Sequence, residues 1–475
     1  MTPYAVLATL LAYFAAIALV SWLAGRRKEG QQVFYTGGRK THWAVVAFAM
    51  IGSCMSGVTF VSVPGMVGTS GFGYLQMCIG FFLGYLVIAF VLTPLYFRLN
   101  VVSIYQYLEK RFGMGAYRTG AWFFFLSKML GASVRLFLVC LTLQLLLFGP
   151  LGLPFWLNVV CNVGICLAYT YRSGVKSVIW TDVLKTGCMI VAVTLCVVLI
   201  GRDLGGIRIQ EKVFFFDDVN HPQYFWKQLV GGLFTVIAMT GLDQDMMQRT
   251  LACKDHRDSQ KNLIVSSILQ TVVIALFLCL GALLYQFAAV HGIPETGDKL
   301  FPAVATGGRL PEIVGVLFVL GLVSSAYGAG GAALTALTTS FTVDILHKAG
   351  EVKVRKAVHL TMAALMVVTI IVFNALNSTS AIDAVYKLGS YTYGPILGLF
   401  AFGILTRRPV KDKYVPVVAL LAPAICLVLQ LNSERWFGGY KFSYELLLLN
   451  AALTFGGLCL LIRRDAPRKR QEASH

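Results

Sequence analysis

Two ionisable residues lie three positions apart inside a long apolar run, in the stretch IWTDVLKTGCMIV that begins at Ile179. On a helix, Asp182 and Lys185 share one face, so a carboxylate and an ammonium can meet there. A third charge, Arg135, interrupts the apolar stretch SKMLGASVRLFLVCLTLQ. Charges buried in apolar surroundings are costly, and each therefore predicts a partner, a cavity or a site of function.

The composition indicates that these runs cross a membrane. Of 475 residues, 57% are hydrophobic and 13% are charged, which is typical of a polytopic membrane protein and not of a soluble domain. The Lys and Arg residues lie mainly in short loops between apolar runs. No basic, aromatic-interleaved face suited to nucleic acid is present. The eleven cysteines lie almost all within apolar runs, which predicts small core residues and no disulfide, metal or cofactor site.

We expect an all-α polytopic protein with 13 transmembrane helices, because thirteen apolar segments are present and most are about 20 residues or longer. The loops between them alternate between basic and nearly uncharged. The positive-inside rule then places the N-terminus outside and the C-terminus in the cytoplasm of a bacterial inner membrane. The segments are residues 3–25, 42–65, 72–97, 119–148, 153–171, 177–201, 228–248, 262–290, 311–346, 357–376, 381–406, 414–431 and 443–462.

The second and seventh segments have Gly and polar residues at their middle, in AFAMIGSCMSGVTFVSVPG and LVGGLFTVIAMTGLDQD. A matched pair of broken helices is typical of transporters with an inverted repeat and a midplane substrate site, although Gly and Ser also let intact helices approach closely. The predicted parts are a leading helix and loop (1–30), two five-helix repeats (31–201 and 228–408) joined by an extracytoplasmic loop (202–227), two peripheral helices (409–463) and a basic cytoplasmic tail (464–475).

Five stretches resemble the solute:sodium symporter family, in the same order along the chain: SIYQYLEKRFG, SGVKSVIWTDVLK, GLDQDMMQRTLACKDHRDSQK, ALTTSFTVDIL and GPILGLFAFGILTRR. The resemblance implies a leucine-transporter-type fold with one leading and two trailing helices. It also implies sodium-driven uptake of a small organic solute by alternating access.

The resemblance extends to the solute site. Arg135 resembles the Arg that the sialic acid branch uses for the substrate carboxylate, and Arg suits bidentate carboxylate recognition. The same branch implies substrate contacts from Ser56 and Thr59, with Gln76 from the next helix. Met239 stands where sugar-transporting members place an aromatic gate, so sugar stacking is not expected. Alternatively, Arg135 pairs with an acid on another helix, and the protein is an ordinary sodium symporter of a sugar, amino acid or monocarboxylate.

The family's usual sodium site matches imperfectly. Its backbone ligands correspond to Gly52 and Met55, but its two hydroxyl ligands correspond to Gly328 and Ala329, which have none. Sodium needs oxygen ligands. One interpretation retains Na⁺ at Gly52, Met55 and Ser325, because Ser324 and Ser325 form a hydroxyl pair four residues, or just over one helical turn, before Gly328 and Ala329. Another is that Lys185, partnered by Asp182, supplies the missing charge, with H⁺ as the alternative coupling ion. A third is that Lys185 extends to water at the helix end.

Two other classes of protein fit less well. A membrane enzyme would need clustered His, Cys or acidic residues at the midplane, and the seven histidines lie near helix ends or in loops, so no catalytic activity is expected. A transporter-like receptor would usually add a soluble output domain, whereas the longest loop has only about 25 residues, too few for a packed core. The expected partners are a small-molecule solute and the lipid bilayer, and the protein is expected to be a monomer.

Overall fold

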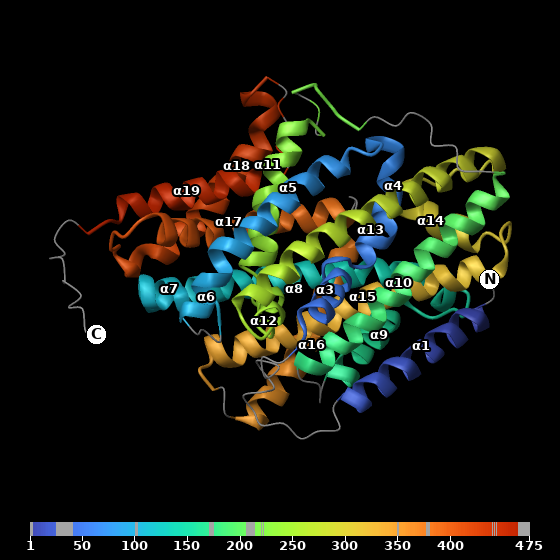
Figure 1. Ribbon diagram of the computed structural model, residues 1–475, viewed down its shortest axis with the longest axis horizontal. Helices are drawn as coiled ribbons and strands as arrows, with labels where there is room; N and C mark the ends of the chain where they lie inside the picture. The colour runs from blue at the N-terminus through green and yellow to red at the C-terminus, as the bar shows by residue number, and fades with distance from the viewer. Residues whose placement is uncertain are drawn as a thin grey trace.

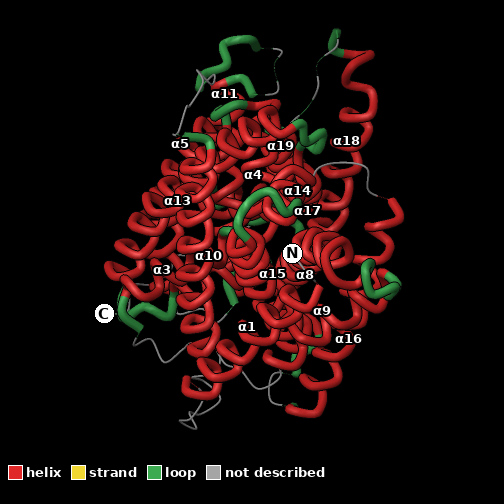
Figure 2. The backbone as a smooth tube through the Cα atoms, turned by 90° about the vertical axis from the view of Figure 1, so that its right-hand side faces the viewer, coloured by secondary structure: helices red, strands yellow, loops and turns green. Residues whose placement is uncertain are grey.

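The structure is a computed structural model that describes residues 3–24, 41–99, 103–170, 175–205, 214–219, 221, 223–348, 351–376, 381–438, 440, 442 and 444–463. These residues form a bundle of helices that run roughly side by side (Figure 1). Within the described ranges, Figure 2 shows helices and loops without strands, and two isolated bridges are the β-type pairings. The predicted tail, residues 464–475, lies outside the described residues.

Every predicted segment contains helix, and most boundaries differ by only a few residues. The helices are α1 (Pro3–Ala24), α3 (Trp43–Cys54), α4 (Gly57–Ser70), α5 (Tyr74–Val87), α6 (Thr93–Leu99), α7 (Gln106–Arg111), α8 (Met114–Leu143), α9 (Phe155–Thr170), α10 (Val175–Asp203), α11 (Phe225–Val236), α12 (Gln244–Thr250), α13 (His256–His291), α14 (Leu300–Thr306), α15 (Glu312–Ser340), α16 (Val352–Leu376), α17 (Ala381–Leu405), α18 (Val415–Trp436) and α19 (Leu446–Leu460).

By length and composition, eight helices in the described residues can cross a membrane, or up to ten if each bent pair is one span. Three shorter apolar helices occupy the remaining predicted segments: Tyr4–Val20, Phe155–Ala168 and Leu446–Leu460. The all-α, multi-pass prediction is therefore confirmed. The number of thirteen crossings stays a prediction.

The sequence analysis missed two short helices, α7 and α14. Each has six or seven residues, too few to give a clear helical period. Four π-helical turns were also missed: η2 (Ile88–Leu92), η3 (Gln144–Phe148), η4 (Ile237–Gly241) and η6 (Phe341–Ile345). Such turns often mark functional positions in helices, and η4 precedes one of the two bends.

Glycine allows the most closely packed helix pair to form. A Cβ atom added at Gly80 of α5 would lie 2.2 Å from the carbonyl oxygen of Leu229 on α11, and one at Gly232 would lie 2.4 Å from the carbonyl oxygen of Met77. Only residues without a side chain permit this approach, as is common between membrane helices. The helix that begins the second predicted repeat, α11, is thereby held against α5, and α12, which follows it, contacts α3 of the first repeat.

The first helix and the last two pack on opposite sides of the bundle. α10 packs against both α3 and α15, and α1 covers α10 and α15 from outside. At the other side, α18 and α19 pack on α17 (Figure 1). This arrangement agrees with a leading helix and two trailing helices around a ten-helix core.

Candidate functional site

The first break in the bundle lies between α3 and α4, which meet at 63°. Met55 and Ser56 have extended backbone there, and the Met55 N–H donates to the Ile51 carbonyl. A Cβ atom on Gly52 would lie 2.3 Å from Thr186 Oγ1 of α10. Gly52 therefore lets the end of α3 lie directly on α10, beside Asp182.

The second break lies between η4 and α12, which meet at 74°. Asp243 caps α12, because its side chain accepts the N–H groups of Asp245 at 2.9 Å and Met246 at 3.1 Å. A carboxylate is the favoured group at a helix N-terminus. Both predicted broken helices are thus confirmed.

A cavity lies between the two breaks, with about 580 Å³ of empty space when the space open to solvent is counted. Arg135 on α8 is the only charged residue among the described residues that line it. Among the described residues it has no hydrogen-bond or ion-pair partner, so the alternative in which an acid on another helix pairs with it finds no support in the described residues. The lining is Cys54, Met55, Thr59, Tyr74, Phe81, Arg135, Thr235, Val236, Met239, Thr240, Met246, Gln270, Ile274 and Tyr386.

The structure brings most of the predicted solute residues together. Thr59, Arg135 and Met239 line the cavity, and Ser56 lies buried at the break beside it. Gln76 does not belong to the lining. Its side-chain amide instead donates to the carbonyls of Gly73 and Gln223 at 3.1 Å and 3.0 Å, which ties α5 to the loop before α11.

A second cavity, of about 450 Å³, continues from Arg135 along α8. Lys128, two helical turns before Arg135, lines it together with Asp243 and Tyr393. Arg135, Met239 and Met246 line both cavities, so they lie where the two meet.

A buried chain of alternating charges runs from Lys128 to Lys185. Lys128 Nζ lies 3.1 Å from both Asp243 and Asp245, Asp245 lies 3.0 Å from Arg249, and Arg249 lies 2.8 Å from Asp182. Asp182 pairs in turn with Lys185. The chain holds three cations and three carboxylates, so it is electrically balanced. We name it the charge chain: Lys128, Asp243, Asp245, Arg249, Asp182 and Lys185.

The charge chain links α8, α10, α12 and the end of α3. Ser53 of α3 donates to Asp182 Oδ2 at 3.0 Å and also contacts Arg249. Tyr393 of α17 donates to Asp243 Oδ2 at 2.7 Å. The sequence analysis missed Asp243, Asp245 and Arg249, although they lie in the quoted stretch GLDQDMMQR. Three charges directly after a broken helix were the signal that could have found them.

Lys185 is 2% exposed. Its ammonium contacts Asp182 Oδ1, so the prediction that the two pair on one helix face is confirmed. The alternative, in which Lys185 extends to water at the helix end, is wrong. The side chain is buried in a helix that packs against α3 and α15, and Asp182 supplies a partner for the ammonium.

The hydroxyls predicted near the ion site face their own helix. Ser324 and Ser325 donate to the carbonyls of Gly321 and Leu322 at 3.0 Å and 2.8 Å. Gly328 and Ala329 lie further along α15 and bring no side-chain oxygen. In the described part of the chain, no group of three or more His, Cys, Asp or Glu residues is arranged to hold a metal ion.

Comparison with known proteins gives one consistent answer. Residues 34–411 match the model of the Sodium:solute symporter family. The chain is 28% identical to a sodium/sialic acid symporter of Aliivibrio fischeri, over 88% of this chain and 86% of that protein. It is 25% identical to sodium-coupled monocarboxylate transporter 1 of Xenopus laevis, over 91% and 72% of the two chains.

A solved structure shares the fold. It is the substrate-bound, outward-open state of a Na⁺-coupled sialic acid symporter, with a TM-score of 0.79 and 19% identity, over 97% of this chain and 99% of that one. The predicted leucine-transporter-type architecture is therefore confirmed by a match over nearly the whole chain.

Proposed function

We infer that this chain is a secondary transporter that carries a small solute across the membrane by alternating access, because it belongs to the sodium:solute symporter family. The cavity between the two broken helices is the natural place for the solute, because broken helices bound the substrate sites of such transporters.

We propose that the solute bears a carboxylate and is a sialic acid or a similar sugar acid. The observation that carries this proposal is the unpaired Arg135 in the cavity lining. The six groups of the charge chain balance one another, so Arg135 leaves one positive charge in excess. A carboxylate would neutralise it and match its fork with two hydrogen bonds. Two of the relatives act on carboxylates by name, sialic acid and monocarboxylates.

Replacing Arg135 by Lys is expected to weaken solute binding by about 1–3 kcal/mol, or roughly 5- to 150-fold, because the ammonium keeps the charge but loses the planar fork. Arg135→Ala should weaken binding further. The measurement is ligand-stabilised melting of purified protein with sialic acid, other sugar acids, monocarboxylates and their neutral amides. Arg309→Lys, at an exposed loop position, is the matched control. Normal binding and uptake of every solute by Arg135→Ala would make this residue structural.

A counterflow assay distinguishes a transporter from a receptor. Proteoliposomes preloaded with unlabelled solute should take up labelled solute transiently above its equilibrium level if the protein carries solute across the membrane. A receptor with the same cavity would bind the solute in the melting assay and show no counterflow.

We propose further that Lys185 replaces the usual sodium charge. Its support is that both oxygens of Asp182 already have cationic partners, Lys185 and Arg249. The hydroxyls of Ser324 and Ser325 are also engaged with their own helix. A sodium ion at this point would have to displace one of these interactions. Coupling would then use a proton on Lys185, or the protein would act as a facilitator or exchanger.

We propose that the protein acts as a monomer in a bacterial inner membrane, with its N-terminus outside and its C-terminus inside. A cysteine introduced at Asp218 should react with an impermeant maleimide added outside intact cells, and one at Lys254 should not. Burial raises the pKa of the neighbouring Cys253 to about 12, so that thiol should stay unreactive in both variants. The reverse labelling pattern would contradict this orientation.

A further inference from the structure

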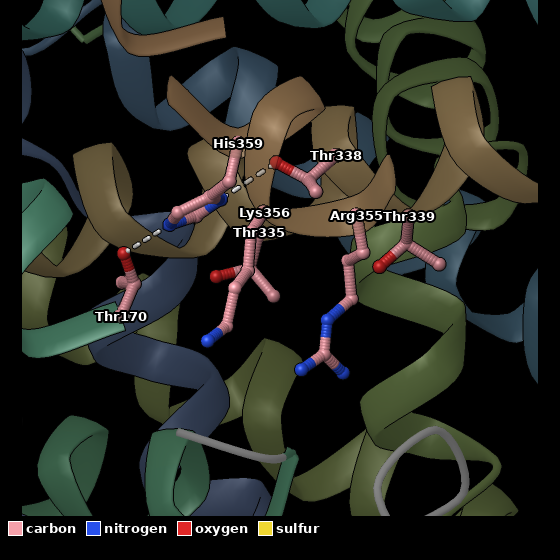
Figure 3. A pocket seen from close by; sticks show the side chains of 7 residues that line it. All are labelled: Thr170, Thr335, Thr338, Thr339, Arg355, Lys356 and His359. Carbon is pink, nitrogen blue, oxygen red and sulfur yellow. Dashed lines mark hydrogen bonds between the residues drawn. The ribbon is translucent and has the colours of Figure 1, made fainter. Parts of the chain in front are cut away.

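A separate basic pocket lies away from the solute cavity, where α9, α15 and α16 meet. Figure 3 shows Lys356 and Arg355 of α16 extending to the same side, with threonines of α9 and α15 around them. The pocket has about 350 Å³ of empty space, counting the part that is open to solvent, and is lined by Thr170, Thr335, Thr338, Thr339, Arg355, Lys356 and His359. None of these residues lines either cavity beside Arg135.

His359 joins the three helices that form this pocket. One ring nitrogen lies 3.0 Å from Thr170 Oγ1 and the other lies 2.7 Å from Thr338 Oγ1 (Figure 3). Both hydroxyls also donate to carbonyls of their own helices, each at 2.7 Å. A hydroxyl has a single hydrogen, and a neutral ring donates from one nitrogen and accepts at the other, so one of these hydroxyls donates to the ring in place of its helix bond. His359 thereby links α9, α15 and α16 beside the two cations.

The pocket opens at one end of an apolar stripe on the outside of α16. At four-residue spacing from Lys356, the exposed side chains are Leu360, Ala364, Val368 and Val372. Residues at this spacing lie along one helix face. The stripe from Leu360 to Val372 is about 18 Å long, so it exceeds the roughly 15 Å depth of one hydrocarbon leaflet. A cation pair at the end of a lipid-facing stripe matches a phospholipid, whose charged headgroup is joined to long acyl chains.

We propose that this pocket binds the phosphate of an anionic phospholipid, with Arg355 and Lys356 as its charge partners. The acyl chains would lie along the stripe that begins at Leu360. Basic pockets between membrane helices are suited to such headgroups. Free inorganic phosphate shares the headgroup chemistry but has nothing to place on the stripe, which is why the lipid is the assigned ligand.

The test uses the full-length protein purified in a neutral detergent, with short-chain phosphatidylglycerol, phosphatidylcholine and inorganic phosphate as separate probes. Phosphatidylglycerol should bind about tenfold or more tightly than phosphatidylcholine. Replacing both cations, Arg355→Gln with Lys356→Gln, should weaken phosphatidylglycerol binding about thirtyfold. The control pair Lys411→Gln with Lys413→Gln removes two exposed charges that do not line the pocket and should change binding less than about twofold. If the double variant does not fold, the exposed Lys356→Gln alone should weaken binding about fivefold.

Two results would overturn the proposal. Equal losses in the pocket variants and in the control pair would show that binding depends on overall charge and not on this pocket. Binding of inorganic phosphate as tight as that of phosphatidylglycerol would show that the stripe contributes nothing and would exclude the lipid assignment. Replacing Leu360 and Val368 by Asn tests the contribution of the apolar stripe. This variant should bind phosphatidylglycerol more weakly and should bind inorganic phosphate as the unmodified protein does.

Discussion

Replacing Asp182 by Asn is expected to lower the free energy of unfolding by about 3–5 kcal/mol, the cost of removing one partner from a buried ion pair. Asp182 is 1% exposed and serves two cations, Lys185 and Arg249, as well as the hydroxyl of Ser53. The amide keeps the shape of the side chain but removes its negative charge. Two buried cations then lie close together without their shared carboxylate.

Denaturation of the purified protein in detergent measures this loss. Asp258→Asn is the matched control, because Asp258 pairs with Lys261 at 3.7 Å on the surface, where the ammonium is 60% exposed. Such a pair contributes about 1 kcal/mol or less. Adding Lys185→Gln to Asp182→Asn should recover part of the stability, since one uncompensated cation is then removed. A loss in Asp182→Asn no larger than in the control would mean that the charge chain contributes little to folding.

The helices and both bends were predictable because they depend on local sequence. Apolar runs of membrane length give helices, and the polar residues around Gly52 and Gly241 gave the positions of the two breaks. The short α7 and α14 were not predictable on the same grounds, since a helix of one or two turns is fixed by its tertiary neighbours and not by its own period.

The site was predictable only in part. Arg135 could be predicted as a site residue because a guanidinium in an apolar helix is costly. Thr59 and Met239 were predicted at the solute site from the family resemblance. Gln76 was predicted to contact the solute, but its side-chain amide donates to the backbone carbonyls of Gly73 and Gln223. Which distant charges meet depends on how whole helices are placed. The pairing of Lys128 with Asp243 and Asp245 across 115 and 117 residues of chain therefore could not be obtained from spacing.

Solute uptake by the unmodified protein should continue in sodium-free buffer based on potassium or choline. The physical reason is the set of contacts around Asp182: its two oxygens have cationic partners, and Gly328 and Ala329 leave α15 without the hydroxyls of the usual site. Sodium would gain few oxygen ligands there and would have to compete with an ammonium held by the same carboxylate. Strict dependence on millimolar sodium would rule this mechanism out and restore the ordinary one, with the ion held by Gly52, Met55 and Ser325.

A triple variant tests the same mechanism from the opposite direction. Lys185→Gln removes the ammonium, and Gly328→Ser with Ala329→Ser supplies the two hydroxyls, so uptake should become dependent on sodium. The matched control carries the two serines and keeps Lys185, and it should remain sodium-independent because the ammonium still occupies the carboxylate. If the control gains sodium dependence equally, the missing hydroxyls alone explain the departure from the family, and Lys185 has only a structural role. If the triple variant alone responds, the positive charge on α10 is what makes sodium unnecessary.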